Sequence, residues 1–222
     1  MVLDNFAIET ICHLNYVNEN SQKIAREHKH AIVGISPHNG YYKEERIYQI
    51  LEWVSCYFDN FTLFLGEGMS YHNFIACGYS EKEAKKKTAA QDRLLLNRVM
   101  RCIEKLQCEN WDILTEKKLF ENKYYLEYIK QSKELYAQTP ALQDILISFV
   151  PFLKCADRQI IYPEKALEYF FLEFPFLLDT PKILSVPSSC FIYNQIPGFV
   201  DYIFNVAKWN QENQGFVALK FS

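Results

Sequence analysis

Two short apolar runs with a helical pattern between them constrain the fold of this chain more than any other feature. Residues 30–35 (HAIVGI) are apolar and β-branched without alternation, which is typical of a buried parallel strand. The strand should end beside Ser36, because Pro37 favours an extended residue before it. Residues 44–58 carry apolar side chains at helical spacing, and residues 61–65 form a second buried run that Gly66 closes. Strand, helix and strand in this order predict a βαβ unit and a parallel sheet.

The rest of the chain continues this alternation of helices and strands. Helices are predicted over residues 81–105, where Ser80 and Glu83 form a capping box, over 142–150, and over 163–178. Pro175 should end or kink the last of these helices. Short strands are predicted over 183–186, 191–193 and 215–221. We expect one α/β domain that comprises residues 1–222.

Composition excludes several classes of protein. Apolar residues make up 49% and charged residues 23% of the 222, which excludes wholesale disorder. The seven cysteines are widely spaced without a CxxC pair, so we expect neither a disulfide framework nor a zinc site. This use of cysteine favours a reducing, cytoplasmic location. No apolar stretch approaches the ~18 residues of a membrane span. The N-terminal residues do not resemble a signal peptide.

Charge is unevenly distributed along the chain. Lys and Arg number 24 against 27 Asp and Glu, a net charge of −3. Residues 82–101 nevertheless hold seven basic and two acidic residues, so this segment is +5 and the remainder −8. On a helix, much of this positive charge forms a stripe opposite an apolar face of Ala84, Thr88, Leu95, Val99, Cys102 and Ile103. The stripe is either a polyanion-binding surface or an ordinary solvated helix face. The stripe consists of Lys82, Lys86, Arg93 and Arg101, and it is flanked by Lys85, Lys87 and Arg98.

Few residues suggest chemistry by their spacing alone. The phosphate loop GxxxxGK[ST], the dinucleotide motif GxGxxG and the zinc motif HExxH are absent, and the segment around Ser36 does not match GxSxG. Ser36 follows a buried parallel strand, where ligands bind in open sheets, although a serine there is also a common helix cap. Tyr169 and Glu173 are one helical turn apart, and Glu173 lies among apolar residues. A carboxylate buried there would have a raised pKa and could act as a general base. The alternative is a core tyrosine and a solvated carboxylate.

Four segments together resemble the tRNA-dependent cyclodipeptide synthases. They occur in the order of that family and at about its spacing, and the basic helix falls where the family has one. The segments are residues 30–42 (HAIVGISPHNGYY), 168–176 (EYFFLEFPF), 185–193 (SVPSSCFIY) and 213–216 (NQGF). The resemblance implies a Rossmann-like α/β fold with a parallel sheet flanked by helices, similar to the catalytic domain of class Ic aminoacyl-tRNA synthetases. It also implies an aminoacyltransferase that makes a cyclic dipeptide, a 2,5-diketopiperazine, from two aminoacyl-tRNAs.

The resemblance also implies roles for individual residues. Ser36 would accept the first aminoacyl group as an ester, and Tyr193 would orient its hydroxyl. Glu173 and Tyr169 would hold the α-amino group and transfer its proton. Asn39 matches the residue that marks the larger subfamily and would support the loop and the aminoacyl group. Asn194, the residue after Tyr193, is also expected to contact the substrate. It departs from the family, which has His or Pro there, and this leaves the subfamily open.

A binding pocket and partners complete the expectation. Ile32, Gly34, Phe64 and Phe176 are placed to line an apolar first aminoacyl pocket, and the basic stripe would contact tRNA phosphates. The aminoacyl ester is already activated, so no cofactor or metal is expected. We expect a monomer that does not bind membranes. Two alternatives are a non-catalytic tRNA-binding module with the same fold and a serine hydrolase unrelated to tRNA.

Overall fold

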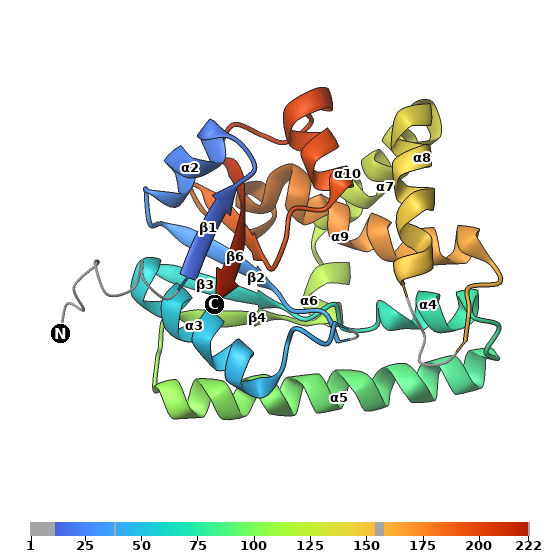
Figure 1. The fold of residues 1–222 in the computed structure, drawn as a ribbon, viewed down its shortest axis with the longest axis horizontal. Helices are drawn as coiled ribbons and strands as arrows, with labels where there is room; N and C mark the ends of the chain where they lie inside the picture. The colour runs from blue at the N-terminus through green and yellow to red at the C-terminus, as the bar shows by residue number, and fades with distance from the viewer. Residues whose placement is uncertain (1–11, 38, 154–157, 222) are drawn as a thin grey trace.

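A six-stranded sheet organises the computed structural model, which describes residues 12–37, 39–153 and 158–221 (Figure 1). The strand order is β1-β6-β5-β2-β3-β4. All neighbours pair in parallel except β1, which joins β6 antiparallel at one edge. The predicted parallel sheet is therefore confirmed, and so is the βαβ unit. The strands are β1 (Cys12–Tyr16), β2 (His30–Gly34), β3 (Asn60–Phe64), β4 (Trp111–Leu114), β5 (Ser189–Tyr193) and β6 (Gln214–Phe221).

Helices cover both faces of the sheet. Alternate side chains of the strands divide the interior into two main cores. Ala31 and Val33 of β2 face the core formed with α2, α3 and α5, whereas Ile32 faces the core of α7, α9 and α10. The helices are α2 (Glu19–Ala25), α3 (Glu44–Tyr57), α4 (Ser70–Ala76), α5 (Glu81–Leu106), α6 (Glu116–Phe120), α7 (Lys123–Gln138), α8 (Pro140–Phe149), α9 (Pro163–Leu184) and α10 (Gly198–Asp201), with a 3₁₀ turn η1 (Val150–Phe152) and a π-helical turn η2 (Tyr202–Ala207).

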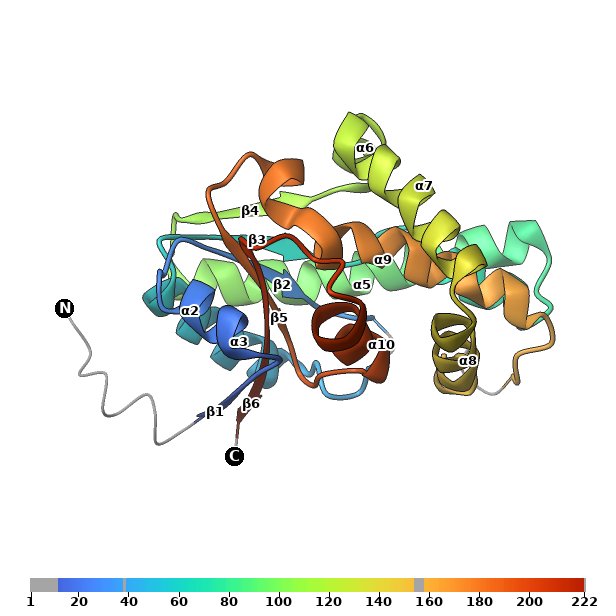
Figure 2. The same ribbon diagram turned by 90° about the horizontal axis from the view of Figure 1, so that it is seen from above.

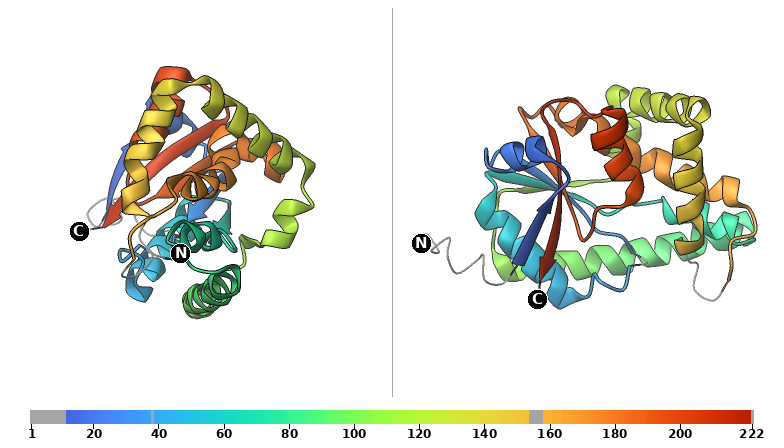
Figure 3. Two further views of the ribbon diagram at one scale, coloured as in Figure 1. Left: turned by 90° about the vertical axis from the view of Figure 1, so that its right-hand side faces the viewer. Right: turned by 45° about the horizontal axis from the view of Figure 1, so that its top comes forward.

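Helix α5 is the longest element and runs along one side of the molecule (Figure 1). Its buried residues are the apolar face predicted from the sequence: Ala84, Thr88, Leu95, Val99, Cys102 and Ile103. The Ser80–Glu83 capping box is also present. The helix packs on α3 and, in its N-terminal half, on α4. The left-hand view in Figure 3 looks nearly along α5 and shows α4 beside it.

Helix α9 differs from its prediction. It continues beyond Pro175 to Leu184, so the strand predicted over 183–186 is wrong. The chain leaves helical geometry only at Asp179 (φ −160°, ψ 67°), whose carboxylate accepts a hydrogen bond from the Lys182 amide at 3.0 Å. Asp179 thus caps a second helical segment, and Pro181 stands in its first turn, where a proline costs no hydrogen bond. Figure 2 shows α9 beside α7, with which it packs.

The topology brings the carboxyl ends of β2, β3 and β5 to one edge of the sheet. Register pairs Gly34 with Phe64 and Val33 with Ile192, so the residues that follow these strands are neighbours. Ligands bind beyond such ends in open parallel sheets. Residues 1–11, which include the segment judged unlike a signal peptide, lie outside the described part of the chain.

Candidate active site

Ser36, Tyr169, Glu173 and Tyr193 line one small pocket at this edge of the sheet. Ser36 stands two residues beyond β2, and Tyr193 is the last residue of the neighbouring β5. Tyr169 and Glu173 point into the same pocket from successive turns of α9. All four side chains are half-buried, so a substrate can reach them. The structure brings together the four residues to which the sequence resemblance assigned catalytic roles.

The hydroxyl of Ser36 is held by two phenols. Tyr169 and Tyr193 are each hydrogen-bonded to it, and Tyr193 is also hydrogen-bonded to the side chain of Asn39. Burial and the nearby charge of Glu173 raise the pKa of both phenols well above 10, so they stay protonated at neutral pH. Asn39 braces the loop, because its side-chain oxygen accepts a hydrogen bond from the Tyr41 amide at 3.0 Å. Ser36 is therefore oriented from two sides.

Glu173 is the titratable group of this pocket. Burial raises the pKa of its carboxyl to about 7. No other described residue forms a hydrogen bond or an ion pair with it, and its neighbours Phe170 and Phe174 are buried core residues. A carboxyl group with a pKa near neutrality can both accept and donate a proton, and it offers an unpaired charge to a cationic ligand.

The predicted aminoacyl pocket is realised in part. Gly34 and Phe64 line the space beside Ser36, together with Ile35, Leu65 and Gly66, which the sequence analysis did not select. Ile32 and Phe176, which were also predicted to line it, are fully buried and are not among the residues that line this space. Both lie behind the pocket wall, because Phe176 packs its ring 4.6 Å from that of Phe64.

Asn194 contacts a buried tyrosine and is not among the residues that line the pocket. It accepts a hydrogen bond from the hydroxyl of Tyr42 at 3.4 Å. The Tyr42 ring is buried and lies 6.0 Å from the ring of Tyr193. Asn194 thus supports the tyrosine that holds Ser36.

The basic residues of α5 fall into two groups. Arg98 is half-buried and donates a hydrogen bond to the Tyr42 carbonyl at 2.8 Å, and Arg101 pairs with Glu44. Lys87 lies 4.9 Å from the centre of the Tyr79 ring. The exposed residues Lys82, Lys85, Lys86 and Arg93 have no ion-pair partner within the described ranges. The charges of this second group are not paired with any described acidic side chain, and its four members all belong to the basic set selected from the sequence.

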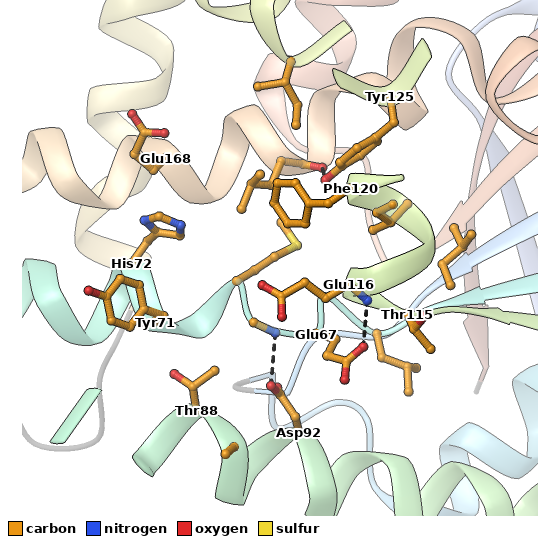
Figure 4. Close-up of a pocket in the computed structure, with 18 of the residues that line it drawn as sticks. Glu67, Tyr71, His72, Thr88, Asp92, Thr115, Glu116, Phe120, Tyr125 and Glu168 are labelled. Carbon is orange, nitrogen blue, oxygen red and sulfur yellow. Dashed lines mark hydrogen bonds between the residues drawn. The ribbon is translucent and has the colours of Figure 1, made fainter. Parts of the chain in front are cut away.

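A large cleft lies beyond the ends of β3 and β4 (Figure 4). Its volume is about 930 Å³, and its walls come from α4, α5, α6, α7 and α9. Most of the lining is apolar, but Glu67, Asp92 and Glu116 point into it (Figure 4). Asp92 accepts a hydrogen bond from the Gly68 amide at 3.0 Å, and burial, aided by Glu67 and Glu116, raises its pKa to about 6. The sequence analysis missed this cleft, although Asp92 is an isolated acid on the basic helix.

Other kinds of site are less well supported. Among the described residues, no cluster of three or more His, Cys, Asp and Glu side chains could hold a metal ion. No helix in the described ranges is long and apolar enough to span a membrane. None of the described residues that line the Ser36 pocket is a histidine, so the base that a serine hydrolase needs is not found there.

Comparison with curated proteins gives relatives of one kind. The chain is 27% identical over 188 residues to the cyclo(L-leucyl-L-leucyl) synthase of Photorhabdus laumondii, covering 78% of this chain and 80% of the relative. It is 25% identical over 227 residues to the synthase of the same name from Staphylococcus haemolyticus, covering 93% of each chain.

Solved structures share the fold. A cyclodipeptide synthase from Bacillus thermoamylovorans superposes with a TM-score of 0.88 at 23% identity, covering 98% of this chain and all of that one. A Mycobacterium tuberculosis protein, described as showing that cyclodipeptide synthetases are related to type I tRNA synthetases, gives 0.83 at 21% identity over 95% and 94% of the two chains. A synthase from Candidatus Glomeribacter gigasporarum, bound to Phe-tRNA, gives 0.57 at 14% identity over 87% and 88%.

These likenesses confirm the α/β fold class predicted from the sequence. The sequence model of the cyclodipeptide synthase family matches residues 13–220, which include every residue of the pocket beside Ser36. This chain belongs to the cyclodipeptide synthase family.

Proposed function

We propose that this protein joins the aminoacyl groups of two aminoacyl-tRNAs into a cyclic dipeptide through an ester on Ser36. One observation carries the proposal: the Ser36 hydroxyl is hydrogen-bonded to Tyr169 and Tyr193 in a pocket that also holds the unpaired carboxyl of Glu173. A serine prepared in this way suits ester exchange with a substrate that is already activated.

In the first step, Ser36 Oγ attacks the carbonyl carbon of an aminoacyl-tRNA. The new ester forms as the bond to the tRNA ribose breaks, and the serine proton leaves with the ribose oxygen. An ester replaces an ester, so no ATP is consumed. Tyr193, tied to Asn39, holds the hydroxyl in position for the attack.

Glu173 binds the α-amino group of this first residue. An ammonium group beside the carboxyl favours its charged form, which offsets the cost of burying that charge. The Tyr169 phenol is hydrogen-bonded to Ser36 and lies close enough to Glu173 for the carboxylate to raise its pKa, so it can contact the same ammonium group.

In the second step, the amine of another aminoacyl-tRNA attacks the ester on Ser36. An amide bond forms, and the Ser36 oxygen leaves and regains a proton. The amine of the first residue then attacks the ester that still joins the dipeptide to tRNA, which closes the ring and releases the tRNA. That amine must first lose a proton, and a carboxyl with a pKa of about 7 can accept it at neutral pH.

The tRNA would lie against α5. Lys82, Lys85, Lys86 and Arg93 are exposed and unpaired, as contacts with a phosphate backbone require. The family member solved with Phe-tRNA supports a tRNA partner. The intact set of pocket residues favours an enzyme over a binding module that has lost its chemistry.

Expression in a bacterial host tests the proposal. The wild type should release cyclic dipeptides into the medium, detected by mass spectrometry, and Ser36→Ala should release none. Ser148→Ala removes an exposed hydroxyl on α8 and serves as the matched control, with wild-type yield. Repeated absence of product with soluble wild-type protein would favour the binding module.

A further inference from the structure

We infer that the large cleft next to the Ser36 pocket binds a cationic side chain, of the lysyl or arginyl class, on one of the two aminoacyl groups that the protein joins. This inference rests on the proposed function and names part of its substrate. It follows from three carboxylates that converge in the cleft without a cation, from a buried hydroxyl beside them that has no partner, and from the position of the cleft against the catalytic pocket.

The three carboxylates meet around Gly68, in the loop that follows β3. Asp92 Oδ2 accepts a hydrogen bond from the Gly68 amide at 3.0 Å. Gly68 has a φ of +77°, and a Cβ there would lie 2.7 Å from Glu116 Oε1, so glycine allows this carboxylate to approach the loop. Glu67 Oε2 accepts a hydrogen bond from the Glu116 amide at 2.7 Å. The carboxylates of Glu67, Asp92 and Glu116 are thus close together, and Figure 4 shows all three directed into the cleft.

This negative charge has no cation beside it in the part of the chain that the structure describes. None of the three carboxylates forms an ion pair there. Lys133 also lines the cleft, but it pairs with Glu168 at 2.8 Å. Lys85 and Arg93 line the cleft as well, and both are exposed and pair with none of the carboxylates. Like charges in a half-buried site disfavour one another, so a cation bound among them would be stabilised.

A buried hydroxyl lies at the same place. Thr88 precedes Asp92 by one turn of α5 and is 5% exposed. Its Oγ1 has no hydrogen-bond partner among the described residues, and the same holds for the buried Asp92 Oδ1. Figure 4 shows the Thr88 side chain directed from α5 toward the cleft. Buried polar atoms are nearly always hydrogen-bonded, so two unpaired acceptors at one cleft indicate a ligand that donates hydrogen bonds.

The cleft adjoins the catalytic pocket. Leu65 lines both spaces, and on α9 Glu173 lines the pocket while the preceding Leu172 lines the cleft. A side chain on an aminoacyl group bound at Ser36 can therefore extend into the cleft, whose volume of about 930 Å³ accommodates a long one. Most of the lining is apolar, including Met69, Leu114, Leu119, Tyr125 and Leu126.

A lysyl or arginyl side chain matches this combination of surfaces. Its methylene stem packs on apolar side chains, and its charged end offers three N–H donors in an ammonium group or five in a guanidinium. Among the described residues, no group of His, Cys, Asp and Glu is arranged to hold a metal ion, so the carboxylates suit an organic cation. A leucyl or phenylalanyl side chain would cover the apolar lining and leave the carboxylates and the Thr88 hydroxyl without a partner.

The composition of the product tests the inference. Purified enzyme is mixed with total tRNA charged with the full set of protein amino acids, and the cyclic dipeptides are quantified by mass spectrometry against synthetic standards. A site built to bind a polar substrate group rejects an analogue that lacks it by up to roughly 10⁴–10⁵-fold, and a half-open cleft by less. Product that contains a lysyl or arginyl residue should therefore exceed product that contains neither by roughly tenfold or more.

A double variant of the cleft supplies the converse test. Asp92→Asn with Glu116→Gln removes two charges, and Asn keeps an acceptor for the Gly68 amide. The ratio of basic to uncharged product should fall roughly tenfold or more, whereas a merely structural role would lower all products alike. Glu127→Gln is the matched control, because Glu127 is an exposed carboxylate of α7 that does not line the cleft, and its ratio should stay that of the wild type. If the double variant does not fold, Glu116→Gln alone carries the same expectation with a smaller change.

The outcomes separate the two levels of the argument. Cyclic dipeptides made only of uncharged residues would overturn the inference and leave the transfer through Ser36 intact. An unchanged ratio in the folded double variant, or an equal fall in Glu127→Gln, would also overturn it. No cyclic dipeptide from any of the charged tRNAs would refute the proposed function itself, and the inference with it.

Discussion

Replacing Glu173 by Gln should stabilise the protein while it removes activity. The folded-state pKa of this carboxyl is about 7, against an ordinary value near 4.5, because burial disfavours the charged form. The folded state therefore binds the proton more tightly than the unfolded state. Ionisation of the buried carboxyl therefore lowers the free energy of unfolding. This loss is absent below pH 4.5, grows between pH 4.5 and 7, and is fully present above pH 7.

The magnitude follows from the shift. A difference of about 2.5 pKa units corresponds to roughly 3 kcal/mol at most, and the half-buried position reduces this to about 1–3 kcal/mol at pH 8. Gln has nearly the same shape and no charge to bury. For a chain of this size, the melting temperature should rise by roughly 3–9 °C at pH 8, and the gain should vanish near pH 4.5.

Urea unfolding at pH 8, 6.5 and 4.5 measures the effect. The control is Glu164→Gln in the exposed first turn of the same helix, for which we expect a change within about 0.5 kcal/mol at each pH. Activity should fall further in Glu173→Gln than in Tyr169→Phe, because a charge-assisted bond to an ammonium is about twice as strong as a neutral one. A Glu173→Gln variant that is less stable than the wild type at pH 8, or equally stable at every pH, would refute the reasoning.

Three further predictions concern the basic helix and the sheet. The double variant Lys86→Glu with Arg93→Glu should weaken tRNA binding and reduce the steepness of log affinity against log salt by about 1.4–1.8, and an unchanged slope in filter-binding titrations would show that α5 is only a solvated face. Arg98→Ala should lower the rate of Ser36 loading through the lost contact with Tyr42 and leave that slope nearly unchanged, and a slope reduced by about 0.8 would instead make Arg98 a phosphate ligand. Burial lowers the pKa of His30 to about 4, so the unfolded state takes up the proton first as pH falls, and about 2 kcal/mol of stability should be lost between pH 7 and 5. The urea midpoint should therefore fall further between pH 7 and pH 5 in the wild type than in His30→Asn, and an equal fall in the two proteins would contradict this.

Local patterns predicted those parts of the fold that short-range physics decides. The βαβ unit followed from apolar runs that are buried on both faces, and the core face of α5 from helical spacing. The error in α9 was also local. Asp179 and Pro181 together are a cap and a first-turn proline, and this signal predicts a restart of the helix rather than the strand that was expected over 183–186.

The site needed information that a single sequence does not contain. Tyr169 and Glu173 share a helix face and could be paired by spacing, but only the resemblance to a family joined them to Ser36 and Tyr193. The contact between Arg98 and Tyr42 joins elements 56 residues apart, so no periodicity could separate Arg98 from the free basic residues. The inner position of Phe176 likewise depends on Phe64 and Tyr125, which come from two other elements.

The ester on Ser36 is the central claim, and mass spectrometry of the protein tests it most directly. The enzyme is mixed with one aminoacyl-tRNA that it loads, quenched in acid, and analysed intact and after proteolysis. We predict a mass increase equal to one aminoacyl residue, located on the peptide that contains Ser36, and no increase in Ser36→Ala. An aminoacyl group on another residue, or the same increase in Ser36→Ala, would contradict the assignment of Ser36 as the nucleophile.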